Sequence, residues 1–178
     1  MESTMSPAPV RPAPTRPAAS APAARPVTRL LPVFDAPATD RVWLVAAHGG
    51  AGCSTIYRSA PALYADAGRA LPYVADPMRP PRVVLCATGS CQGLDALRAL
   101  LAEWDAGMLT PCVLLGVAVT ACMARPPRPL RRGCLQVGSA APRLWRLPYL
   151  ASVPVEGWPD RWPAAYGRMA DALEGMRG

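Results

Sequence analysis

The sequence predicts an α/β fold in three layers, with a small, mostly parallel sheet covered by helices on both faces. Apolar runs of strand length recur at residues 41–47, 82–88, 113–121 and 143–148. Segments with helical spacing of apolar residues follow them, and such alternation favours parallel strands joined by crossover helices. A glycine-rich turn directly follows the first run, at the sheet edge where open α/β sheets bind ligands.

The first half of the folded region contains two predicted strands. The apolar run 41–47 forms the first strand, and a short helix begins at Ser54. Pro61 should interrupt this helix, because proline removes a backbone hydrogen bond. A loop then continues to about Pro81, and the second strand covers residues 82–88.

Capping and stop signals define the next helix. Ser90 can cap a helix over residues 91–106, and Gly107 is a suitable stop. The spacing of its large side chains keeps one face apolar. These side chains are Leu94, Leu97, Leu101 and Trp104.

The remaining elements follow the same alternation. The third strand covers 113–121, and a short helix starts with Pro127 or Pro129 in its first turn. The fourth strand covers 143–148, and the last helix extends from about residue 160 to 176. An apolar stripe marks that helix and consists of Trp162, Tyr166, Met169 and Leu173.

Composition divides the chain into a tail and a domain. Residues 1–38 contain nine prolines and nine alanines with interspersed arginines. Such a tract buries little apolar surface, so we expect a disordered, polyproline-like tail. A docking arm for an acidic partner is the alternative. The folded domain is predicted over residues 39–178.

The glycine-rich turn has the layout of a phosphate-binding loop. A working loop has the form G-x-x-x-x-G-K-[ST], in which backbone N–H groups and the lysine hold phosphates and the hydroxyl holds Mg²⁺. Here Cys53 stands at the lysine position, and all 19 basic residues of the chain are arginine. His48 can donate to a phosphate, act as a base or form backbone hydrogen bonds in a structural role. The candidate phosphate-binding residues are His48, Gly49, Gly50, Gly52, Cys53, Ser54 and Thr55.

This loop resembles the deviant Walker A motif, K-G-G-x-G-K-[ST]-[ST], of ParA/MinD-type ATPases. The resemblance implies a P-loop-like fold, with ATP and Mg²⁺ as cofactors and a homodimer formed around nucleotide. His48 stands at the signature lysine, Cys53 at the loop lysine, and Thr120 at an asparagine that contacts the base. The Walker B aspartate has no counterpart, and Asp76 is a poor candidate for it. We therefore expect a degenerate family member that does not hydrolyse nucleotide and has no catalytic residues.

A second resemblance covers most of residues 41–174. The loop, the turn Asp66-Ala67-Gly68-Arg69 and the segments 127–131 and 142–148 resemble short, uncharacterised actinobacterial proteins with H-G-G-A-G-x-S-T loops. Such proteins are often met near mobile-element genes. This resemblance implies a fold and a lineage, and it assigns no activity.

A cluster of arginines forms the second candidate site. No acidic residue occurs between Asp105 and Glu156, so a one-sided positive surface can attract nucleic acid or an acidic protein. A solvated helix face in an arginine-rich chain is the alternative. The candidate basic patch consists of Arg125, Arg128, Arg131, Arg132, Arg143 and Arg146.

Other features of the sequence bear on membrane insertion, metal binding and cellular location. The longest apolar run, 113–123, is too short to span a bilayer, and the N-terminus lacks the apolar core of a secretory signal. The six cysteines form no C-x-x-C pair and the chain has one histidine, so no metal site is predicted. We expect a cytoplasmic protein with reduced thiols.

Three functions remain open at this stage. The first is a pseudo-ATPase that serves as an interaction or regulatory module for a protein partner. The second is a nucleotide or phosphate binder that uses backbone amides and an arginine from elsewhere. The third is a basic protein associated with nucleic acid.

Overall fold

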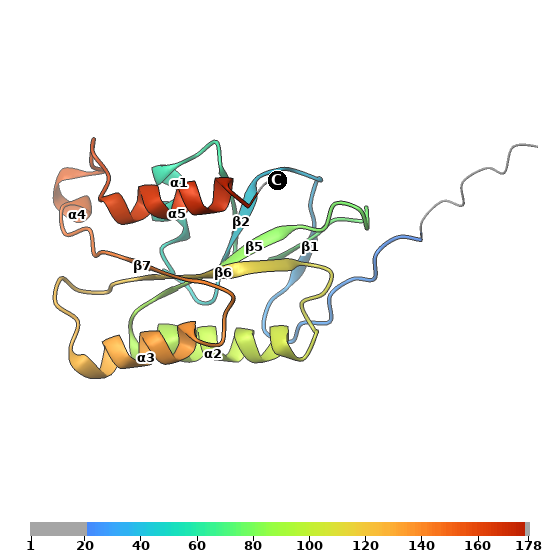
Figure 1. The fold of residues 1–178 in the computed structure, drawn as a ribbon, viewed down its shortest axis with the longest axis horizontal. Coiled ribbons are helices and arrows are strands. Elements are labelled where there is room, and N and C mark those ends of the chain that lie inside the picture. The colour runs from blue at the N-terminus through green and yellow to red at the C-terminus, as the bar shows by residue number, and fades with distance from the viewer. Residues whose placement is uncertain (1–20, 177–178) are drawn as a thin grey trace, which may run out of the picture.

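A computed structural model describes residues 21–176 and has the α/β fold that the sequence predicts. Five parallel strands form the main sheet in the spatial order β3-β2-β5-β6-β7 (Figure 1). The strands are β2 (Val42–Ala46), β3 (Tyr64–Gly68), β5 (Arg82–Thr88), β6 (Val113–Thr120) and β7 (Leu144–Leu147).

Helices cover both faces of this sheet, which gives three layers (Figure 1). The helices α2 (Cys91–Asp105) and α3 (Arg128–Gly138) pack on one face, and α1 (Cys53–Ser59) and α5 (Ala164–Glu174) pack on the other. A further short helix, α4, covers Val153–Glu156. The central strands are buried from both sides, which explains their nearly continuous Val, Leu and Ala composition.

The strand order is that of a doubly wound sheet. Numbered along the chain, the five strands have the order 2-1-3-4-5, so the chain changes direction between β2 and β5. In this order the crevice between the first and third strands, at their carboxyl ends, is the expected ligand position. The glycine-rich loop after β2 lies at this point.

Several local predictions are confirmed. The strand predicted at 82–88 is β5, and α1 ends at Ser59, before Pro61. Ser90 caps α2, because its Oγ accepts a hydrogen bond from the Gly93 N–H at 3.1 Å. Pro129 lies in the first turn of α3. The last helix is shorter than predicted, since α5 begins only after Pro163.

The prediction of a loop between Pro61 and Pro81 was wrong. It contains β3 and a further strand, β4 (Leu71–Tyr73), which pairs in parallel with β1 (Val33–Asp35) in a second, two-stranded sheet. β3 is the edge strand of the main sheet, and its burial is incomplete. Its sequence therefore lacks the apolar run by which the other strands were recognised.

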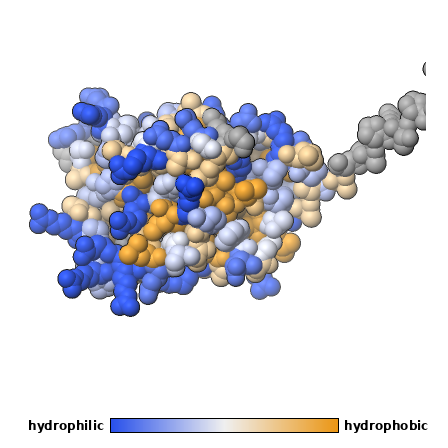
Figure 2. Space-filling view, in the orientation of Figure 1, coloured by the Kyte–Doolittle hydropathy of each residue, from blue (hydrophilic) through white to orange (hydrophobic). Residues whose placement is uncertain are grey.

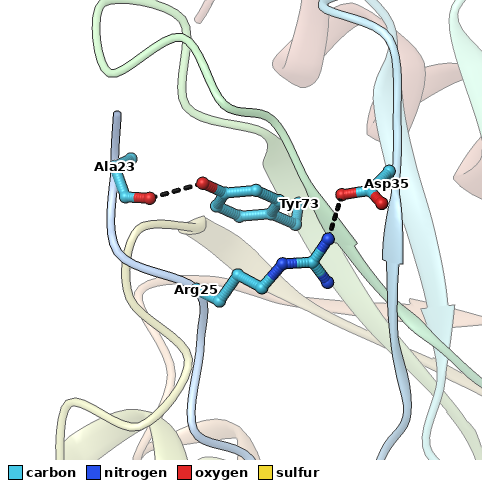
Figure 3. A network of polar contacts seen from close by, with 4 residues as sticks. All are labelled: Ala23, Arg25, Asp35 and Tyr73. Carbon is cyan, nitrogen blue, oxygen red and sulfur yellow. Dashed lines mark hydrogen bonds and ion pairs between the residues drawn. The ribbon is translucent and has the colours of Figure 1, made fainter. Parts of the chain in front are cut away.

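The boundary between tail and domain also needs correction. Residues 21–38 lie against the domain, and residues 1–20 are outside the described part of the chain. Leu31 is 5% exposed, and β1 pairs with β4. Tyr73 donates a hydrogen bond to the Ala23 carbonyl, and Arg25 lies over the Tyr73 ring and pairs with Asp35 (Figure 3). The packed region therefore begins before residue 39.

Between residues 21 and 176, no helix combines the length and apolar character needed to cross a bilayer.

Candidate functional site

The glycine-rich loop turns sharply between β2 and α1. Gly50 and Gly52 have φ values of 74° and 87°, which side-chain-bearing residues adopt only with strain. The Gly52 carbonyl accepts the first helical hydrogen bond, from the Ile56 N–H at 3.1 Å. A Cβ on Gly52 would lie 3.0 Å from the Thr120 Oγ1, so the loop closely approaches the end of β6. The two glycines are thus required by the turn itself.

His48 joins this loop to the end of β5. Its Nδ1 lies 2.7 Å from the Gly49 carbonyl, and its Nε2 lies 3.1 Å from both the backbone N–H and the Oγ1 of Thr88. A carbonyl only accepts and an N–H only donates, so these partners assign the proton to Nδ1 and the lone pair to Nε2. Both ring nitrogens are therefore engaged within the protein. The structural role considered for His48 matches this arrangement.

Cys53 lies in the core on the α1 face of the sheet. Its side chain is 6% exposed and packs with the apolar residues between β2, α1 and α5. A hydrogen bond with the Cys53 thiol, together with burial, raises the pKa of the Cys86 thiol well above its ordinary value. The Cys53 thiol therefore belongs to the packed interior.

A cavity of about 440 Å³ lies beside the loop. Besides the loop residues His48 to Thr55, it is lined by Asp66, Gly68 and Arg69 from the end of β3 and the following turn. The Ser54 Oγ donates to the Asp66 Oδ2 at 3.4 Å, and the Gly68 N–H donates to the Asp66 Oδ1 at 2.8 Å. The cavity thus holds backbone amides, hydroxyls, one carboxylate and one guanidinium.

Asp66 and Arg69 were not among the candidate site residues. The sequence indicates the turn that contains them only through a resemblance, because β3 lacks the apolar run that predicts a strand. A strand adjacent to β2 brings its carboxyl end beside the glycine-rich loop, since parallel strands end at the same edge. The sequence signal for these two residues would have been an acid and an arginine on either side of a glycine, at the end of such a strand.

The six arginines of the basic patch are all exposed. They occupy the loop before α3, the N-terminal half of α3 and the region of β7, and Figure 2 shows hydrophilic residues gathered at that end of the molecule. Within residues 21–176, none of the six forms an ion pair. In this described part of the chain, their positive charge is therefore not paired with a carboxylate.

The described residues hold no cluster of three or more His, Cys, Asp or Glu side chains able to bind a metal ion. The six cysteines are free thiols. Comparison of the chain with protein-family models, with curated proteins and with solved structures found no match.

Proposed function

We propose that the protein is a non-hydrolysing pseudo-ATPase of ParA/MinD type that acts as an interaction or regulatory module. The proposal rests on the side chains found at the two positions where the ParA/MinD-type motif has lysine. His48 is tied to Gly49 and Thr88, and Cys53 is buried beside Cys86. Catalysis of phosphoryl transfer depends almost entirely on positioned positive charge and metal ions. Two structural side chains in those places remove that charge.

The basic patch supports binding to a partner. Six exposed arginines without ion pairs in the described region favour an acidic protein surface. The same charge favours nucleic acid as an alternative partner, since arginine binds phosphate oxygens with two hydrogen bonds. The resemblance further suggests a mobile-element protein that works in the cytoplasm, and a homodimer is compatible with this role.

The loop cavity favours a second candidate function, the binding of a nucleotide or phosphate. Arg69 lines the cavity and supplies a cation that does not come from the loop. Gly49, Gly50 and Gly52 leave the backbone amides accessible, and Ser54 is exposed beside them. In this function Asp66 and Ser54 would face a bound Mg²⁺.

Calorimetric titration with ATP and GTP, with and without Mg²⁺, tests these functions together with an assay of phosphate release. The pseudo-ATPase proposal expects neither heat of binding nor turnover, whereas turnover that disappears in Ser54→Ala would contradict it. The phosphate-binder candidate expects binding without turnover, weakened about tenfold in Arg69→Gln because one charge-assisted contact is lost. Arg41→Gln, at the opposite end of β2, is the matched control.

A duplex oligonucleotide in the same calorimeter tests the nucleic-acid alternative. Binding through the patch would weaken steeply with added salt, because arginines displace counterions from phosphates. Binding that is insensitive to salt would argue against contact through the arginines.

A further inference from the structure

A second cavity, of about 500 Å³, lies at the carboxyl ends of β6 and β7. It extends between the N-terminal half of α3 and the first turn of α5, and it shares no residue with the loop cavity. Its volume is within the range of small-molecule sites, about 300–1,000 Å³. This position is the edge of the sheet at which open α/β folds bind ligands.

The inner walls of this cavity are apolar. Leu130 and Cys134 come from α3, Val119 from β6 and Leu147 from β7. Proline and alanine side chains complete the lining on the side of α5. On the face drawn in Figure 2, apolar residues form a band beside the hydrophilic region. An apolar group placed here would be removed from water on several sides.

Three arginines surround these walls, namely Arg131, Arg146 and Arg168, and no acidic residue contributes to the lining. All three are exposed, and none has an ion pair within residues 21–176. Burial raises the pKa of the Cys134 thiol, and the positive charge of Arg146 opposes this rise. The guanidinium charge of Arg146 is therefore felt at the apolar wall. We call this cavity the arginine-rimmed pocket.

We propose that the arginine-rimmed pocket binds a small amphipathic anion, with its apolar body against Leu130, Val119 and Leu147 and its carboxylate or phosphate group at the arginines. Guanidinium groups match both oxyanions because they present parallel N–H donors. A neutral apolar ligand would leave the three charges without a partner, and a fully polar anion would leave the apolar wall hydrated. The combination of wall and rim selects a molecule with both properties.

Fluorescence titration of the full chain with anilinonaphthalene sulfonate, an apolar body with one anionic group, tests the proposal. N-phenylnaphthylamine, which lacks the charge, is the matched neutral probe. We expect the anionic probe to bind, and its affinity to fall about fivefold to tenfold in Arg131→Gln and Arg146→Gln. Arg132→Gln removes the same charge from the next position of α3, outside the lining, and should leave the affinity nearly unchanged.

A second variant tests the apolar part. Ala164 is exposed at the start of α5 and lines the pocket, so Ala164→Phe should fill its mouth and weaken binding of both probes. Displacement by naphthoate or by naphthyl phosphate then distinguishes a carboxylate ligand from a phosphate ligand. Equal affinities for the charged and neutral probes, or equal losses in Arg131→Gln and Arg132→Gln, would overturn the proposal. So would failure of both anions to displace the probe. Circular dichroism of each variant checks that the fold is retained.

Discussion

Gly93, in the first turn of α2, controls how closely this helix approaches the carboxyl edge of the sheet. A Cβ at this position would lie 2.2 Å from the Thr88 carbonyl oxygen and 2.9 Å from the His48 Nε2. Both distances are far below van der Waals contact. Because Thr88 also binds His48 through its backbone N–H, this one glycine allows the helix, β5 and the glycine-rich loop to meet.

We expect Gly93→Ala to lower the free energy of unfolding by about 2–3 kcal/mol, since the new methyl group must displace backbone. Gly167→Ala is the matched control, because that glycine lies in α5 with no atom within 4 Å of an added Cβ. It should raise the stability by about 0.5–1 kcal/mol through helix propensity. Urea denaturation measures both. Equal effects of the two substitutions would show that the close approach at Gly93 does not exist.

The sequence predicted the position of the glycine-rich loop, but it did not predict which residues its side chains contact. The partner of His48 is Thr88, and the partner of Cys53 is Cys86, both on a strand far along the chain. Only the placement of β5 beside β2 brings these residues together. Local spacing therefore identified the turn glycines, whereas the roles of His48 and Cys53 depended on tertiary structure.

At the scale of elements, strands were predictable where burial is two-sided. β5 and β6 are runs of Val, Leu and Ala, and their bounds were predicted to within one residue. β3 and β4 contain Asp66 and Pro72, so neither periodicity nor composition distinguished them from a loop. β1 was hidden because the average composition of the Pro/Ala-rich segment outweighed its three residues.

The N-terminal segment is held to α2 by one buried carboxylate. Glu103 is 8% exposed, and its two oxygens accept hydrogen bonds from the Thr28 hydroxyl at 2.6 Å and from the Arg29 N–H at 2.7 Å. Hydrogen bonds to a charged group contribute about 1.5–3 kcal/mol. Residues 21–36 thus contribute to the stability of the domain, contrary to the expectation of a disordered tail.

We expect Glu103→Ala to lower the free energy of unfolding by about 2–3 kcal/mol, because the Arg29 N–H and the Thr28 hydroxyl lose their acceptor. Asp95→Ala, which removes an exposed acid on the same helix, should have little effect. A double-mutant cycle of Thr28→Ala with Glu103→Ala should give a coupling energy above about 0.5 kcal/mol. Strictly additive effects would mean that the two side chains do not interact.

At the scale of the whole molecule, the strand order separates the two cavities. The loop cavity lies toward β3, and the arginine-rimmed pocket lies toward β6 and β7. His48, which lines the loop cavity, is hydrogen-bonded to Thr88 at the crevice where the sheet changes direction. The position at which this sheet order ordinarily accepts a ligand is thus lined by a side chain that is already hydrogen-bonded within the protein. Because the two cavities share no lining residue, nucleotide binding at the loop and anion binding at the arginine-rimmed pocket can be tested independently.

The buried thiols and phenols give the whole molecule a predictable response to alkaline pH. Burial raises the pKa of Cys112 to about 12 and of Tyr166 to about 12, and the pKa values of Cys86, Cys134 and Tyr64 are also raised. A thiol in the unfolded chain loses its proton near pH 9.0, whereas the folded thiol keeps it. The unfolded state therefore binds fewer protons above this pH, and stability falls as the pH rises.

The Cys112→Ser variant removes one titrating thiol, and it therefore measures the contribution of Cys112 to this pH dependence of stability. The Cys112 thiol donates to the Pro72 carbonyl at 3.2 Å, and a serine hydroxyl can form the same hydrogen bond without titrating in this range. Below pH 9 both folded and unfolded thiols are protonated, so the variant should change the stability by a constant amount. Between about pH 9 and 11, the free energy of unfolding of the wild type should fall more steeply than that of the variant, by about 1.4 kcal/mol per pH unit. Urea titrations under reducing conditions at several pH values measure the two slopes. Parallel slopes would show that Cys112 titrates equally in the folded and unfolded chains, and hence that the contact between β4 and the start of β6 leaves its thiol hydrated.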